Sequence, residues 1–263
     1  MKVVILCGGR GIRLAQQSDY IPKAMVKLGH RPIVWHVMKR YSLFGFNEFI
    51  LALGYKGEMI RDFFANYDLY TGDVRIELSK GDDFEQLSRH GESEWKITLV
   101  DTGEAALTGS RIARCKKYLD KESDFMVTYA DCLADVNLEK LLKFHKKNKK
   151  IATISGVVPP FRIGELLVKK NLAIGFYNAA NVKSHLIERY INGGFMVFKS
   201  QVFSYLSPFN ECMLETEVFE NLIKDSQLAI YPHHGFWRWL DTDRDYLFLA
   251  DLVDKNKSHW LQE

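Results

Sequence analysis

The chain has few cysteines, no long apolar run and little excess of either charge. Its four cysteines, at positions 7, 115, 132 and 212, are scattered over 263 residues and form no C-x-x-C pair. This spacing argues against a zinc site or a disulfide framework. The net charge of +3 is too small to indicate nucleic acid or a membrane as a partner.

Apolar runs are also short. The first one, Val3–Leu6, is too short for a signal peptide or a membrane span. Lysines gather between Lys143 and Lys150, but they close an amphipathic helical pattern, which favours a solvated helix end over a binding patch. We therefore expect a cytoplasmic globular protein with reduced thiols.

Two periodicities alternate along the first half of the chain. Short β-branched runs predict strands, and 3.6-residue patterns between and after them predict helices. The expected strands are 3–6, 49–53 and 125–129, and the expected helices are 32–44, 57–67, 110–118 and 137–146. Such alternation is typical of an α/β, Rossmann-like fold, with a mostly parallel central sheet and helices on both faces. Ligands of such sheets bind beyond the carboxyl ends of the strands.

Other segments depart from this alternation. Residues 73–101 predict a hairpin-like insertion with strands at 74–78 and 96–100 around a polar loop. Strand-like runs over 151–197 predict antiparallel additions, and further elements are expected at 214–224 (helix), 228–231 (strand) and 242–252 (helix). No linker or repeat is evident, so we expect one domain over 1–263. Its nucleotide-binding half would be 1–135 and its acceptor-binding half 136–263.

A glycine-rich run, Leu6-Cys7-Gly8-Gly9-Arg10-Gly11-Ile12-Arg13-Leu14, follows the first strand directly. Glycines let the backbone approach an anion and turn its N–H groups towards it, although such a turn can also be purely structural. The spacing matches neither the G-x-x-x-x-G-K-[ST] phosphate loop nor G-x-G-x-x-G. Arg13 and the nearby Lys23 add two cations, which suit a polyphosphate.

Two aspartates are candidate metal ligands. Asp131 ends the apolar run 125–130, and Asp241 follows the aromatic run 235–240. Either could instead cap a helix, but Asp135 and Asn137 are better cap candidates than Asp131. Two carboxylates from distant strands that meet at one sheet edge would suit Mg²⁺, which favours one or two carboxylates with phosphate oxygens.

The order of these motifs resembles the sugar nucleotidyltransferase superfamily, which has a GT-A-like fold. Its pattern is a G-G-x-G-[TS]-R-[LM] loop, then P-K-x-[ML]-[VL], a strand that ends in aspartate, and a late second aspartate. Further segments resemble the branch of glucose-1-phosphate cytidylyltransferases, which use CTP. They are residues 33–39, 54–57, 64–67, 73–95, 98–103, 108–111, 128–131, 191–195 and 235–237.

The resemblance implies a Mg²⁺-dependent cytidylyltransferase that transfers CMP from CTP to a phosphorylated acceptor such as glucose 1-phosphate and releases pyrophosphate. It implies catalytic roles for Arg13, Lys23 and Asp131, and a Mg²⁺ site at Asp131 and Asp241. The implied nucleotide-binding residues are Leu6, Gly8, Gly9, Gly11, Ile12, Arg13, Lys23, Arg111, Tyr129 and Asp131. The implied acceptor-binding residues are Arg162, Gly164, Lys183, Asn192, Gly193 and Trp237.

Two positions depart from the family pattern. Ile12 stands where threonine or serine is usual, and Ala179 stands where the family has a lysine that clamps the sugar phosphate. Three explanations remain open for Ala179. Lys183, Arg162 or Lys170 could supply the charge; the acceptor could be another sugar phosphate or a non-sugar phosphate, as in capsule decoration; or the chain could bind CTP or a CDP-linked metabolite without turnover.

Other functions are less well supported. A dinucleotide oxidoreductase fails on the glycine spacing and on the missing acidic residue about 20 residues further on. Adjacent residues on a strand point to opposite faces, so His233 and His234 rarely chelate one metal. Trp237 and Trp239 share a face and are expected in the core or in an acceptor-pocket wall rather than as a stacking platform. Likeness to the cytidylyltransferase branch implies a homo-oligomer, such as the hexamers of that branch, with contacts through 73–95.

Overall fold

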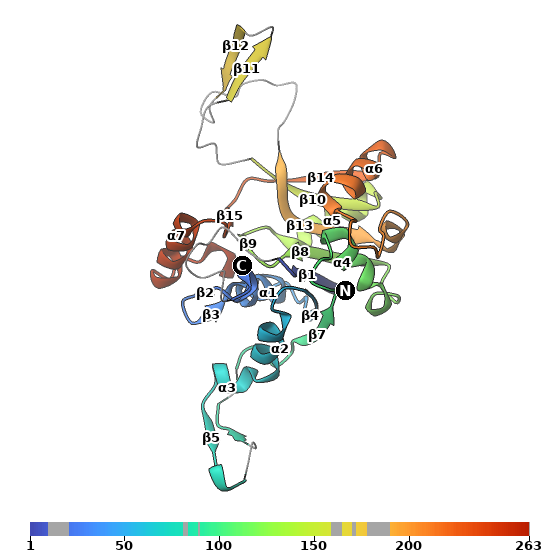
Figure 1. Cartoon of the computed structure of the whole chain (residues 1–263). Coiled ribbons are helices and arrows are strands. Elements are labelled where there is room, and N and C mark those ends of the chain that lie inside the picture. The colour runs from blue at the N-terminus through green and yellow to red at the C-terminus, as the bar shows by residue number, and fades with distance from the viewer. Residues whose placement is uncertain are drawn as a thin grey trace.

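The computed structural model describes residues 1–9, 21–80, 84–88, 90–158, 165–169, 172–177 and 190–262. A seven-stranded sheet forms its centre, in the order β14-β10-β13-β8-β1-β4-β7 (Figure 1). The strands are β1 Lys2–Cys7, β4 Glu48–Leu53, β7 Lys96–Asp101, β8 Asp124–Tyr129, β10 Ala152–Val157, β13 Ile191–Lys199 and β14 Leu228–His233. Within this sheet β13 is antiparallel to both its neighbours and every other pairing is parallel. The predicted α/β class, a mostly parallel sheet with antiparallel additions, is confirmed.

Both faces of the sheet are covered, and the strand β1 shows why. Val3, Ile5 and Cys7 belong to one buried cluster, whereas Val4 and Leu6 belong to another. Because successive strand residues point to opposite faces, a wholly apolar strand needs a cover on each side. The covering helices are α1 Ile33–Ser42, α2 Gly57–Ala65, α5 Leu138–Asn148 and α7 Asp243–Asp254 on the first side, and α4 Thr108–Arg114 and α6 Phe219–Lys224 on the second.

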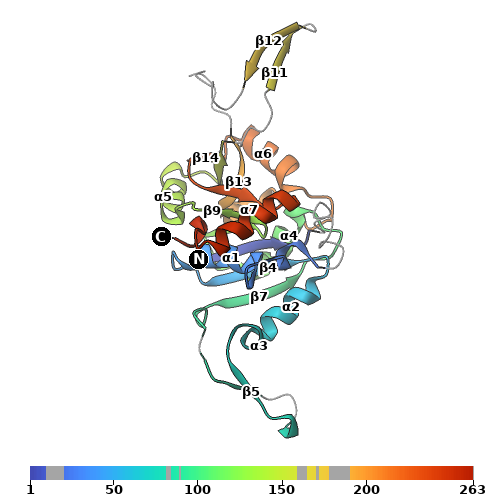
Figure 2. The ribbon, with the colours of Figure 1, turned by 90° about the vertical axis from the view of Figure 1, so that its left-hand side faces the viewer.

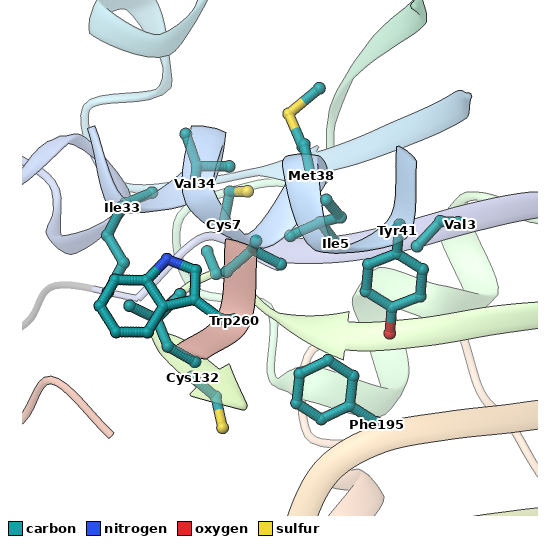
Figure 3. Close-up of a cluster of buried hydrophobic side chains, with 14 of the residues drawn as sticks. Val3, Ile5, Cys7, Ile33, Val34, Met38, Tyr41, Cys132, Phe195 and Trp260 are labelled. Carbon is teal, nitrogen blue, oxygen red and sulfur yellow. The ribbon is translucent and has the colours of Figure 1, made fainter. Parts of the chain in front are cut away.

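The larger cluster joins the sheet to the C-terminal segment (Figure 3). Trp260 is fully buried, and its indole Nε1 donates to Nδ1 of His36 over 3.2 Å. Nε2 of the same imidazole lies 3.0 Å from the carbonyl oxygen of Leu28. Tyr41 stacks on Phe195 at 5.9 Å between ring centroids. Helix α1 therefore ties the sheet to the chain's last turn.

Two segments project from this body on opposite sides (Figures 1 and 2). One is the hairpin of β11 Glu165–Lys169 and β12 Leu172–Tyr177. The other contains α3 Tyr67–Thr71 and the pair β5 Val74–Ile76 and β6 Phe84–Gln86. We call residues 67–95 the arm. None of the helices in the described ranges is long and apolar enough to cross a membrane.

The arm differs from the insertion expected at 73–101. Its first strand pairs with β6, inside the stretch expected to be a polar loop, whereas the expected strand 96–100 is β7 of the central sheet. Residues 96–101 pair in parallel with β4 over six positions, from Glu48 with Lys96 to Leu53 with Asp101. Parallel pairing with a buried neighbour holds this strand in the sheet, so the insertion ends at about residue 95.

Candidate active site

A pocket lies at the carboxyl ends of β1 and β8. The chain passes from β1 outward to β4 and β7, and then returns to the other side of β1 as β8. This reversal is a topological switch point, where the following loops separate and leave a crevice. The pocket is lined by Leu6, Cys7, Gly8, Gly9, Lys23, Ala24, Ala106, Leu107, Thr108, Arg111, Tyr129, Ala130, Asp131 and Met213.

Two short strands bring the predicted acidic pair together. Strand β9 (Cys132–Ala134) begins just after Asp131, and β15 (Trp237–Trp239) ends just before Asp241. They pair antiparallel, with Trp239 opposite Cys132. The start of β9 therefore lies beside the end of β15, and the amide of Leu240 donates to the carbonyl oxygen of Asp131 over 2.9 Å.

Lys23 links the two carboxylates. Its Nζ lies 2.6 Å from Oδ2 of Asp131 and 3.2 Å from Oδ1 of Asp241, so both acids face one cation. Burial by itself lowers the pKa of Lys23, but the charges and hydrogen bonds of Asp131 and Asp241 raise it above its ordinary value. The side chain thus remains an ammonium at neutral pH.

Neither acid caps a helix. Thr242 is the N-cap of α7 and forms a capping box with Asp245. Asn137 caps α5, because its side chain accepts from the amide of Lys140. Asp131 and Asp241 are therefore placed to contact a ligand at this edge.

The pocket residues fit a Mg²⁺ ion that is bound together with phosphates. In the described ranges, no group of three or more His, Cys, Asp or Glu side chains could hold a metal alone. Mg²⁺ commonly takes one or two carboxylates and completes its octahedron with water and phosphate oxygens. The ammonium between Asp131 and Asp241 shows that these two oxygens can face a single cation. They are the residues that would hold it.

A hydrogen-bonded cluster on the pocket wall includes two residues that the sequence did not single out. The hydroxyl of Tyr129 donates to Oε1 of Glu215 over 2.5 Å, and Thr108 donates to Oε2 over 2.6 Å. Burial, and then the carboxylate of Glu215, raise the pKa of Tyr129 well above its ordinary value. Glu215 lies in a π-helical turn, Leu214–Val218, and such turns often occur at functional sites.

The acceptor residues that were predicted fall into two groups. Asn192, Gly193 and Trp237 gather beside Tyr129: Nδ2 of Asn192 donates to its hydroxyl over 3.0 Å, and the indole of Trp237 donates to the Gly193 carbonyl over 2.9 Å. Other predicted positions lie outside the described residues, namely Gly11, Ile12, Arg13, Arg162, Gly164, Lys170, Ala179 and Lys183.

His233 and His234 have different neighbours, whereas Trp237 and Trp239 lie side by side. Nε2 of His233 lies 3.1 Å from Oδ1 of Asp135, whereas the ring of His234 lies beside that of Tyr190 at 6.5 Å. Trp237 and Trp239 are half-buried with ring centroids 5.9 Å apart. Both tryptophans pack against the larger core cluster.

Comparisons with known proteins agree on one family. A family model described as Nucleotidyl transferase matches residues 2–163. The probable glucose-1-phosphate cytidylyltransferase of Bacillus subtilis (strain 168) is 38% identical over 261 residues, 99% of each chain. The glucose-1-phosphate cytidylyltransferase of Salmonella typhimurium is 36% identical over 262 residues, which cover 99% of this chain and 98% of the relative.

The fold also matches solved structures. The structure of HddC from Yersinia pseudotuberculosis complexed with GMP-PN superposes with a TM-score of 0.66. The match covers 96% of this chain and 99% of that chain at 21% sequence identity. At this identity the likeness supports the fold alone.

Proposed function

Because this chain belongs to the nucleotidyl transferase family, we propose that it transfers CMP from CTP to a phosphorylated acceptor, a sugar 1-phosphate such as glucose 1-phosphate, and releases pyrophosphate. The observation that carries this proposal is the meeting of Lys23, Asp131 and Asp241 beside a pocket lined by the Leu6–Gly9 backbone. Cations, backbone amides and a divalent-ion site are what a triphosphate requires. The names of the relatives from Bacillus and Salmonella support CTP and glucose 1-phosphate as substrates.

The proposed reaction is an in-line displacement. An oxygen of the acceptor's phosphate attacks the α-phosphorus of CTP, and the bond from that phosphorus to the bridging oxygen breaks. The electron pair leaves with pyrophosphate. No catalytic base is needed, because a phosphate monoester is already ionised near pH 7. The protein therefore contributes positioning and charge stabilisation.

Roles for the pocket residues follow from their positions. The Leu6–Gly9 backbone would face the nucleotide, and the ammonium of Lys23 would neutralise charge on its phosphates. Arg13, outside the described residues, is proposed for the same task. Asp131 and Asp241 would hold Mg²⁺, which when bound supplies positive charge to the triphosphate and to the leaving pyrophosphate.

The acceptor site departs from the family pattern, because Ala179 replaces its lysine. A second candidate function is the same transfer to a different phosphate, either another sugar phosphate or a phosphorylated alcohol or amino acid. Asn192, Gly193 and Trp237, which gather at Tyr129, would contact the acceptor in either case.

We also propose that the chain self-associates through the arm. Six large apolar side chains there are more than a third exposed, Leu78 most of all at 91%: Leu69, Tyr70, Ile76, Leu78, Phe84 and Leu87. Apolar side chains gathered on a projecting segment favour burial against another protein surface. A second copy of this chain is the partner that the family likeness favours.

A substrate matrix tests the reaction. The four ribonucleoside triphosphates are each combined with a panel of phosphorylated acceptors, and released pyrophosphate is measured with Mg²⁺ present. We expect release with CTP and a sugar 1-phosphate, and a loss of at least about 100-fold in Asp131→Asn. Asp243→Asn is the matched control, because Asp243 is exposed and lies two residues from Asp241. A folded wild-type protein that releases no pyrophosphate from any pair would refute the proposal.

A further inference from the structure

Arg111 lies beneath the turn that follows β1. The residue projects from α4, its exposed fraction is only 5%, and it also lines the pocket. A cation beside a triphosphate site would be expected to bind phosphate directly. The bonding of this guanidinium indicates a different task.

The two terminal nitrogens of Arg111 point at protein oxygens. Nη1 donates to the carbonyl oxygens of Leu53 (3.0 Å) and Gly103 (2.8 Å) and to Oγ1 of Thr102 (2.7 Å). Nη2 donates to the carbonyl oxygens of Gly8 and Glu104, each over 3.2 Å. These two nitrogens carry four N–H groups in a fixed plane. Five oxygens already surround them, so a phosphate would have to displace backbone partners.

The acceptors of Arg111 are at the ends of three neighbouring strands. Gly8 follows β1, Leu53 ends β4, and residues 102–104 follow β7. The carbonyl oxygens of Leu53 and Gly8 each accept from one backbone amide, of Thr102 and Tyr55 respectively, and the planar guanidinium adds a second donor to each and joins them to the loop after β7. Arg111 therefore fixes the three loops of this sheet edge relative to one another.

Two glycines leave room for the guanidinium. A Cβ atom at Gly8 would lie 2.0 Å from Cζ of Arg111, and one at Gly54 would lie 2.4 Å from its Nη1. Neither contact is possible between real atoms. Glycine at these positions is thus required by the arginine beneath, and not only by an anion above.

The contact at Gly8 also sets the direction of the next amide. The Gly8 carbonyl accepts from Arg111 and from the amide of Tyr55, the latter over 3.3 Å. In a trans peptide the N–H of Gly9 points opposite to that carbonyl. Gly9 is exposed, and among the described residues no atom lies within 4 Å of the Cβ position there. The positive end of this peptide is therefore directed away from Arg111, at a residue that lines the pocket.

We propose that Arg111 is a positioning residue, which holds the Gly8 carbonyl away from the pocket and so aims the Gly9 amide at the phosphates of the bound nucleotide. This inference rests on the proposed function, because it concerns the same pocket. The nucleotide-binding effect of Arg111 is then confined to the phosphates.

The test compares ligands with and without phosphates. Binding of CTP and of cytidine is measured by calorimetry for the wild type and for Arg111→Lys. Lysine keeps the charge but has a single nitrogen, which cannot reach acceptors on three strand ends. We expect CTP affinity to fall about 10- to 100-fold, with cytidine affinity unchanged. Arg114→Lys is the matched control, because Arg114 donates to Thr102, Pro208 and Asn210 but does not contact Gly8. It should bind CTP as the wild type does.

A second set of variants keeps the test decisive if Arg111→Lys does not fold. Gly54→Ala places a Cβ atom against Nη1 of the guanidinium without changing Gly8, and it should reproduce the phosphate-selective loss. Gly8→Ala should weaken CTP binding less in an Arg111→Ala background than in the wild type, because the clashing group is gone.

Three results would overturn the inference: equal losses for CTP and cytidine, wild-type CTP binding in Arg111→Lys, or the same cost of Gly8→Ala in both backgrounds. Failure of the wild type to bind any nucleoside triphosphate would refute the proposed function instead. The thermal stabilities of the Gly54→Ala, Arg111→Ala and double variants still test the packing in that case, since the two substitutions should not be additive.

Discussion

Replacing Lys23 by methionine should tighten metal binding while it slows the reaction. In the structure the Lys23 ammonium stands between Asp131 and Asp241, where a divalent ion would bind. Metal and ammonium therefore compete for the same oxygens, and the lysine must release them before it can reach the phosphates. Methionine has a similar length and no charge, so the metal no longer has to displace the ammonium of residue 23.

The size of this effect follows from the exposure of the three side chains, which is 15% for Lys23, 21% for Asp131 and 31% for Asp241. The free-energy contribution of such partly buried ion pairs lies between two limits. Exposed pairs contribute about 0–1 kcal/mol, and breaking a buried pair costs about 3–5 kcal/mol. A combined contribution of about 1.4–2.8 kcal/mol corresponds to a roughly 10- to 100-fold gain in metal affinity. Turnover should fall by about 100-fold, because one phosphate-neutralising group is lost.

The measurement is Mn²⁺ binding without nucleotide, followed by electron paramagnetic resonance or calorimetry, next to pyrophosphate release by the same samples. Lys27→Met is the matched control, because Lys27 is an exposed lysine four residues away, and both quantities should match the wild type. General damage to the site would weaken metal binding and turnover together. Unchanged or weaker Mn²⁺ binding by Lys23→Met would therefore refute the competition between ammonium and metal.

The remaining predictions concern acid stability and assembly. Burial lowers the pKa of His36 to about 4, whereas the unfolded chain has an ordinary imidazole with a pKa of about 6.5. The unfolded state therefore takes up the proton first, and stability should fall between pH 6.5 and pH 4 by up to about 3 kcal/mol. In urea unfolding, the free energy of unfolding of His36→Gln should fall less between pH 6.5 and pH 4 than that of the wild type, whereas the exposed control His259→Gln should follow the wild type. An equal fall in His36→Gln and the wild type would contradict the assignment of this pH dependence to His36. Leu78→Glu should lower the mass of the assembly in sedimentation experiments without loss of fold, and an unchanged mass would contradict the arm as the contact.

Much of the central sheet could be predicted because its signal is local. The strands β1, β4 and β8 are continuous apolar runs, and α1, α2 and α5 carry helical periodicity near the predicted bounds. Asp131 could be placed at the sheet edge for the same reason. Strand β7 has an equally clear local pattern, but its partner cannot be read from it. The sequence pattern places β7 in the insertion, because the pairing of β7 with β4 depends on residues nearly 50 positions away.

Contacts between distant residues could not be predicted from local sequence patterns, and only the family resemblance led us to expect Asp131 and Asp241 at one site. Asp241 reaches Asp131 through β9 and β15, and each of these strands has only three residues, too few to show an alternating pattern. The hydrogen bond from Arg111 to Gly8 spans 103 residues of sequence. The family resemblance implied that this arginine contacts the nucleotide. Its burial and its carbonyl partners, from which we propose a positioning role, depend on the folded loops.

Arg111 and Lys23 show how two cations at one pocket can do different work. The guanidinium of Arg111 is planar and matched to several carbonyl oxygens at once, so moving it would break many hydrogen bonds together. The ammonium of Lys23 is a point charge on a flexible stem with two carboxylate partners, so it can exchange them for phosphate oxygens one at a time. The fixed cation suits a backbone that must keep its amides aimed. The cation that can change partners suits a site where charge arrives with the nucleotide and leaves with pyrophosphate. A double variant with lysine at position 111 and arginine at position 23 should therefore impair the pocket, even though its net charge stays the same.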